Sequence, residues 1–186
     1  MGLCAYTVKK EQGLFWLSFF LFVGTAAGTI FCNHMSMEMK NTLEQWFAGI
    51  LAPAELSSVD YYSLFAGVLK KRFVWILVGI LICQTSLSGI ICYASAVCVS
   101  FQAAVIVCAL TMHSGFSGIL LFFGLVFPQG IFYALAAYLL WIVVREPVRG
   151  NEQSRILSMI LLTALGIAAE TLINPEVSAG VFRFFS

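Results

Sequence analysis

Residues 73–144 read FVWILVGILICQTSLSGIICYASAVCVSFQAAVIVCALTMHSGFSGILLFFGLVFPQGIFYALAAYLLWIVV, and they contain no Asp, Glu, Lys or Arg. In a water-soluble domain of this size, part of so long an uncharged stretch would have to lie on the surface, where charged residues normally face the water. One crossing of a bilayer takes roughly 20 apolar residues. The stretch therefore predicts about three membrane spans, with lipid rather than water as the solvent.

The composition of the whole chain agrees with a membrane protein. Hydrophobic residues make up 61% of the sequence and charged residues 10%, whereas soluble domains carry about 25% charged residues. Ten basic and nine acidic side chains produce no field that would gather phosphates, so we expect no nucleic-acid partner. The one basic cluster, Lys70, Lys71 and Arg72, adjoins the uncharged stretch, as basic residues at a membrane boundary do.

The cysteines and histidines show no pattern of a metal or catalytic site. None of the six cysteines forms a C-x-x-C pair, and four lie within apolar runs, which favours small apolar packing residues. His34 and His113 fall in predicted turns without a carboxylate cluster, so we expect no metal and no cofactor. No serine or cysteine has a base at a recognisable spacing, and the sequence therefore predicts a protein that is not an enzyme. The cysteines are Cys4, Cys32, Cys83, Cys92, Cys98 and Cys108.

The first apolar run, residues 14–32, predicts a retained membrane span. Apolarity continues past the small residues that would resemble a signal-peptide cleavage site. Gly24 and Gly28 lie four residues apart in this run and share one helix face. A G-x-x-x-G pair lets a second helix backbone come close, although such pairs also arise by chance.

Residues 33–72 form the one long polar section, and we interpret it as two amphipathic helices. The apolar face of the first is expected to include Trp46 and Phe47, and Pro53 would end this helix. The second would begin at Ser57-x-x-Asp60 as a variant of the capping box. These helices lie on the bilayer or the bundle in one interpretation, and dock a partner protein in the other. The two expected apolar faces are Leu43, Trp46, Phe47, Ile50 and Leu51, then Tyr61, Leu64, Phe65, Val68 and Leu69.

The remaining spans are expected at residues 73–93, 96–112, 116–144 and 156–173. Residues 113–115 would form a turn. Pro128 divides the expected span at residues 116–144, because proline removes a backbone hydrogen bond. The predicted fold class is thus all-α, with residues 1–186 forming a single multi-pass bundle of about five spans in the cell membrane. Five basic residues would face each side, so charge leaves the orientation open.

Two polar residues fall within the predicted spans. Gln129 follows Pro128, and Glu170 lies in the last turn of the final span. A charged residue at the bilayer centre costs about 2.5–3.5 kcal/mol on insertion scales, and less near the interface. Glu170 therefore lies in the headgroup layer, or else its carboxyl meets Gln129 or the backbone that Pro128 leaves unpaired.

Three sequence motifs occur in a fixed order along the chain. The first is GTIFCN, which ends the first span at Asn33. The second is FPQGIF at residues 127–132, followed by AAYL at 136–139. The third is AAETLINP, which contains Glu170 and ends at Pro175. Together they resemble the stage II sporulation protein M family, in which a proline followed by glutamine or histidine breaks a span and a glutamate precedes a proline at the last one.

The resemblance covers nearly the whole chain and implies a function. Members of the family that act in sporulation are multi-spanning anchors that recruit two peptidoglycan-degrading partners, the stage II sporulation proteins D and P, to the septal membrane during engulfment. Many relatives carry an acidic residue shortly after the proline, where this chain has Tyr133. The resemblance thus implies a non-catalytic scaffold among membrane lipid and membrane-anchored proteins. The alternative is a permease-like or transporter-associated subunit, because broken helices often line substrate sites.

Overall fold

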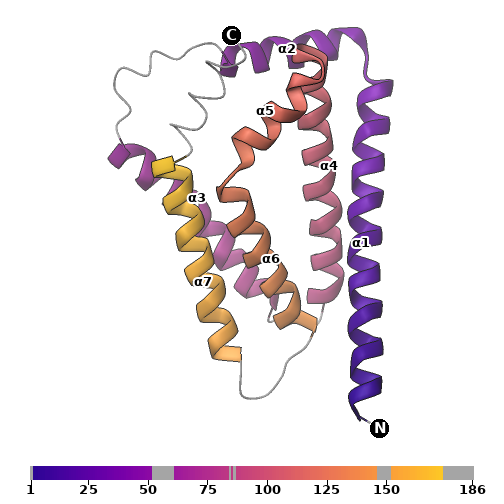
Figure 1. Cartoon of the computed structure of the whole chain (residues 1–186), viewed down its shortest axis with the longest axis vertical. Helices are drawn as coiled ribbons and strands as arrows, with labels where there is room; N and C mark the ends of the chain where they lie inside the picture. The colour runs from indigo at the N-terminus through magenta and orange to yellow at the C-terminus, as the bar shows by residue number, and fades with distance from the viewer. Residues whose placement is uncertain (1, 52–60, 84, 86, 146–151, 174–186) are drawn as a thin grey trace.

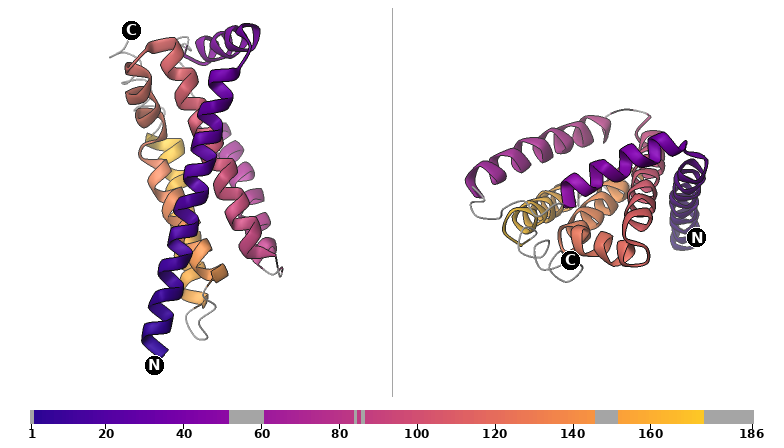
Figure 2. Two further views of the ribbon diagram at one scale, coloured as in Figure 1. Left: turned by 90° about the vertical axis from the view of Figure 1, so that its right-hand side faces the viewer. Right: turned by 90° about the horizontal axis from the view of Figure 1, so that it is seen from above.

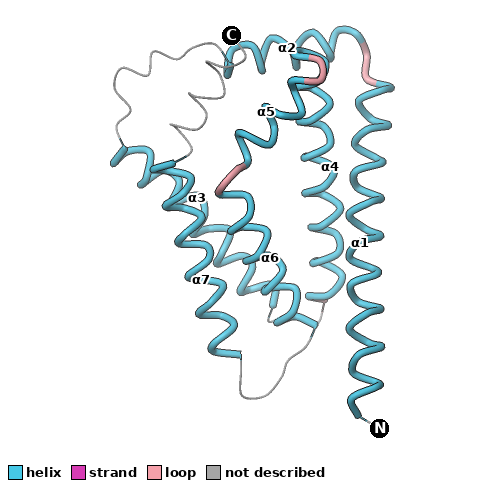
Figure 3. The backbone as a smooth tube through the Cα atoms, in the orientation of Figure 1, coloured by secondary structure: helices cyan, strands magenta, loops and turns pink. Residues whose placement is uncertain are grey.

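The computed structural model describes residues 2–51, 61–83, 85, 87–145 and 152–173, and within these ranges all regular structure is helical (Figures 1 and 3). The all-α class is therefore confirmed. The helices are α1 (Gly2–His34), α2 (Met37–Leu51), α3 (Tyr61–Cys83), α4 (Ser88–Ser114), α5 (Ser117–Val126), α6 (Gln129–Arg145) and α7 (Glu152–Ala168), and α7 continues into a π-helical turn, η2 (Ala169–Ile173).

The long helices run roughly along one axis, and α2 lies across one end of the bundle (Figures 1 and 2). Three helical segments are long and apolar enough to span a membrane, namely Glu11–His34, Ser88–Met112 and Gln153–Ile173. A fourth span is possible in the bent pair α5 and α6, whose axes differ by 66°. The outward faces of these segments suit lipid, since large side chains such as Phe15 and Phe22 are exposed at 65% and 71%.

The α3 helix combines two parts that the sequence analysis separated. Residues 61–72 were expected to belong to an amphipathic helix and residues 73–93 to a separate span, but one helix runs without interruption from Tyr61 to Cys83. Its uncharged part, residues 73–83, is about 17 Å long at a rise of about 1.5 Å per residue, which is shorter than the hydrocarbon core. The predicted capping box at Ser57 and Asp60 lies outside the described residues.

The predicted boundary between the second and third spans, at residues 94–95, is wrong. The break comes earlier, where the Ser88 N–H donates to the Thr85 carbonyl at 3.1 Å and α4 begins. The α4 helix then continues through Tyr93 and Ala96. The hydroxyl of Ser95 donates to the Cys92 carbonyl at 2.8 Å within the same helix, so this residue does not interrupt it.

Two predicted breaks occur, although the first comes two residues later than expected, because His113 and Ser114 belong to α4. The α4 helix ends before Gly115, whose φ of 61° suits glycine and whose N–H donates to the Thr111 carbonyl at 2.9 Å. The α5 helix ends at Val126, just before Pro128, and α6 begins at Gln129. The predicted span at 116–144 is therefore a pair of helices joined at a sharp bend.

The α1 and α4 helices pack along a seam of small residues, as the G-x-x-x-G pair predicts. A Cβ atom at Gly28 would lie 2.7 Å from the Phe101 carbonyl oxygen and 2.9 Å from the Ala104 Cβ. A Cβ atom at Gly24 would overlap the backbone and side chain of α4 at Val97 and Ser100. Both glycines are therefore needed for the two backbones to approach this closely.

Candidate functional site

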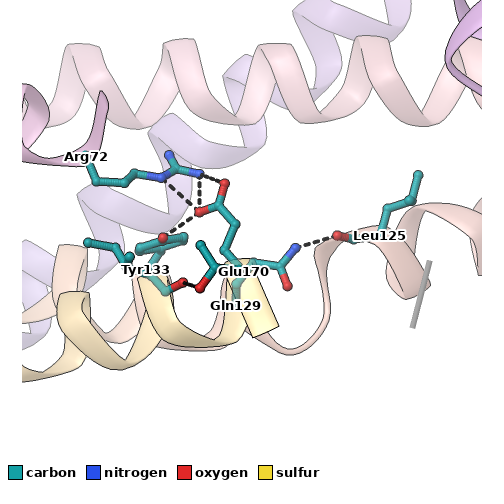
Figure 4. A network of polar contacts seen from close by, with 7 residues as sticks. Arg72, Leu125, Gln129, Tyr133 and Glu170 are labelled. Carbon is teal, nitrogen blue, oxygen red and sulfur yellow. Dashed lines mark hydrogen bonds and ion pairs between the residues drawn. The ribbon is translucent and has the colours of Figure 1, made fainter. Parts of the chain in front are cut away.

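Three polar side chains from α3, α6 and η2 form a cluster (Figure 4). The guanidinium of Arg72 donates to the carboxylate of Glu170 through Nε at 3.1 Å and through Nη2, which lies 2.9 Å from both oxygens. The hydroxyl of Tyr133 donates to Oε2 of the same carboxylate at 2.6 Å. Glu170 therefore accepts from two helices at once, and such charge-assisted bonds are the strong ones.

Tyr133 also supports the cluster through its ring. The Cζ atom of Arg72 lies 4.4 Å from the ring centroid, which is a cation–π contact. The opposite helix α7 carries Gly166 at this level, where a Cβ atom would lie only 2.7 Å from the ring Cε1. The missing side chain at position 166 thus leaves room for the ring, and the ring positions the guanidinium.

The carboxylate is presented by a local irregularity in the last helix. The final turn, Ala169–Ile173, is π-helical, and π-helical turns often occur at functional sites. The hydroxyl of the buried Thr171 donates to the Ile167 carbonyl at 2.9 Å and contacts the Ala168 carbonyl at 3.2 Å, at the junction where the helix widens. These bonds satisfy carbonyl groups where the helical ladder changes its register.

The ion pair is only partly shielded, with 33% of the Arg72 side chain and 21% of the Glu170 side chain exposed. In lipid, a lone charge of either sign would cost about 2.5–3.5 kcal/mol near the bilayer centre. Pairing leaves the two residues neutral together, while the hydrogen bonds satisfy both carboxylate oxygens. The cluster therefore ties α3 to α6 and to the end of the last helix.

The hypothesis that Gln129 meets Glu170 is wrong. The side-chain amide of Gln129 donates instead to the carbonyl of Leu125, across the break at Pro128 (Figure 4). This bond pairs a carbonyl oxygen at the end of α5. The partners of Glu170, Arg72 and Tyr133, were not predicted, although Arg72 is the last charged residue before the long uncharged stretch and ionisable groups in membranes usually pair.

Asn33 and Trp46 are not part of this cluster. Asn33 is exposed near the end of α1, and Trp46 of α2 is 63% exposed. Phe47 belongs to α2, but its side chain and all of Pro175 lie outside what the structure describes. Among the described residues, no three His, Cys, Asp or Glu side chains are grouped so as to hold a metal ion.

A pocket opens beside the cluster between α3, α6 and α7. Its volume is about 220 Å³, and its lining includes Arg72 and Tyr133 of the cluster. The rest of the wall is mostly apolar and includes Trp75, Gly79, Leu140 and Thr163. An apolar pocket with a few converging polar groups is the usual form of a ligand site.

Over the described residues the chain is all-helical, with three, or up to four, helices suited to cross a membrane, and an ion-paired cluster joins α3 and α6 to the end of the last helix. This set of features is typical of a multi-pass membrane protein. No protein-family model, curated protein or solved structure matches the chain.

Proposed function

We propose that this protein is a non-catalytic, multi-pass scaffold of the cell membrane, similar to the stage II sporulation protein M family. Its role would be to anchor peptidoglycan-degrading partners at the engulfing membrane. The observation that carries the proposal is the position of α2, which lies across one end of the bundle (Figure 2). Leu43 packs against Ala109 and Leu110 of α4, while Met39 and Trp46 of α2 remain exposed at 51% and 63%. The helix is thus attached to the bundle and still presents apolar side chains.

The motif residues support a structural role. Gly24 and Gly28 pack against α4, Gln129 bonds across a helix break, and Glu170 joins two other helices. Each of these residues is used in contacts within the chain. A rigid anchor needs contacts of this kind, because a partner recruited to a flexible bundle would not be held in one orientation.

The scaffold would cross the membrane five times, through α1, α3, α4, the α5–α6 pair and α7. The short apolar part of α3 would complete its crossing through local thinning of the bilayer, with Lys70, Lys71 and Arg72 at the membrane boundary. Reporter fusions at the two ends of the chain test this arrangement. Five crossings require the ends to lie on opposite sides, whereas four crossings would bring both to the same side.

Recovery of partners from sporulating cells tests the scaffold itself. The tagged protein should co-purify with wall hydrolases resembling the stage II sporulation proteins D and P. The double variant Trp46→Ala/Phe47→Ala should reduce this recovery while the protein stays in the membrane. Trp16→Ala is the matched control, because Trp16 is also exposed, at 47%, but belongs to α1. Equal recovery by wild type and the double variant would place docking on another surface.

A second candidate is a permease-like subunit, favoured by the pocket that Arg72 of the ion pair lines, next to a helix of the bent pair. Vesicles reconstituted with the wild type and with Glu170→Gln distinguish the two functions. A transporter should show a substrate-dependent flux that the variant changes. A scaffold should show none in either sample.

A further inference from the structure

The Arg72 guanidinium retains a nitrogen that is not used in the ion pair. Its Nε and Nη2 atoms bond Glu170, whereas Nη1 bonds no residue that the structure describes. Arg72 lines the pocket, and its side chain is one-third exposed. Because a guanidinium carries N–H groups on all three nitrogens, Nη1 can donate to an oxygen that enters the pocket.

The surroundings of Arg72 are positively charged. Lys70 and Lys71 precede it in α3, and both are exposed. Glu170 pairs with Arg72 and so neutralises one of three adjacent positive charges. A ligand that approaches this part of α3 is therefore favoured when it is an anion.

The pocket is too small to enclose a whole ligand of ordinary size. Its volume is about 220 Å³, whereas pockets for drug-sized molecules have about 300–1,000 Å³. Trp75 is part of its wall and is also 66% exposed, so the pocket continues onto the outer face of α3, where Val78, three residues further along the helix, is exposed as well. A ligand that fits has an anionic end and an apolar chain, with only part of the chain inside.

We infer that this pocket binds an anionic phospholipid. A phosphate oxygen accepts a hydrogen bond from Nη1 of Arg72, and Lys70 and Lys71 add attraction of longer range. Part of one acyl chain occupies the space beside Gly79, and the remainder lies along the exposed face of α3. The site needs neither a docking partner nor transport, so it goes beyond the proposed function.

Native mass spectrometry of the purified full chain tests the site, with phosphatidylglycerol and phosphatidylcholine as probes. The wild-type protein should retain phosphatidylglycerol about tenfold better than phosphatidylcholine. Gly79→Leu fills the pocket without a backbone clash, because a Cβ atom there meets only Leu140 Cδ2 at 3.6 Å. This variant should lose about tenfold in retention. Gly67→Leu is the control on the same helix, since nothing lies within 4 Å of a Cβ atom at that position.

The charge at the site is tested through the two lysines, which leave the ion pair intact. Lys70→Gln and Lys71→Gln should each lower the preference for phosphatidylglycerol by about fivefold. Equal retention of both lipids by wild type, or unchanged retention by Gly79→Leu, would overturn the inference. Displacement of bound lipid by inorganic phosphate alone would also overturn it, because the apolar chain would then contribute nothing.

Discussion

The seam between α1 and α4 and the corner between α3, α6 and η2 hold helices together in opposite ways. The seam relies on small residues, and the hydroxyl of Ser100 within it donates to the Ala96 carbonyl of its own helix at 2.9 Å. The corner relies on Arg72 and Glu170, which bond across the elements. Lipid explains why both occur, because apolar helices gain little from burial there and associate through close packing or through polar bonds.

The contrast predicts that steric change harms the seam most. Gly24→Leu should destabilise the protein by about 3 kcal/mol or more, since the new side chain meets the backbone of Val97 and has no room to move. Unfolding in mixed micelles, followed by circular dichroism, measures this loss. Ala27→Leu is the control, because Ala27 is exposed on the same helix and should tolerate the change. Equal losses in the two variants would contradict a packing role for Gly24.

Removal of one charge at the corner should destabilise the protein somewhat less than Gly24→Leu does. Arg72→Gln and Glu170→Gln should each cost about 2 kcal/mol, because each leaves an unpaired charge on a membrane helix. The double variant should cost clearly less than the sum of the single variants, with a coupling of about 1–2 kcal/mol in the same unfolding assay. Additive losses would show that the pair does not act as a unit.

The Tyr133 hydroxyl provides a finer test of the corner. Tyr133→Phe removes the hydrogen bond to Glu170 but keeps the ring beside Arg72 and Gly166. We expect a loss of about 1 kcal/mol in unfolding free energy. Tyr138→Phe, on the same helix, should change stability less, because Tyr138 stacks on Trp141 through its ring. A larger effect at position 138 would contradict the proposed bonding.

The smallest effect is expected at the helix break. Gln129→Leu removes the bond to the Leu125 carbonyl, yet it also removes the buried Oε1 atom, which has no partner among the described residues. The two changes offset each other, and a net loss of about 0.5 kcal/mol should remain. Gln102→Leu, at an exposed position of α4, serves as the control. A loss above about 2 kcal/mol would show that Gln129 does more than pair one carbonyl.

Local sequence features predicted much of this architecture. The absence of charge over residues 73–144 indicated helices in lipid, because only helices and closed barrels satisfy the backbone there. Pro128 and Gly115 marked two breaks, and Gly24 with Gly28 marked a close helix contact. These features act within one or two helical turns, so they can be read from the chain directly.

The identity of the residues that pair with Glu170 was decided by the tertiary structure. Arg72 is 98 residues away and Tyr133 is 37 residues away, and no local periodicity connects either of them with the carboxylate. Arg72 was interpreted as a membrane-boundary residue, and α3 was divided at that point, whereas the folded chain uses Arg72 inside one continuous helix. The need for pairing follows from the cost of a charge in lipid. The choice of partner follows from how α3, α6 and η2 meet in space.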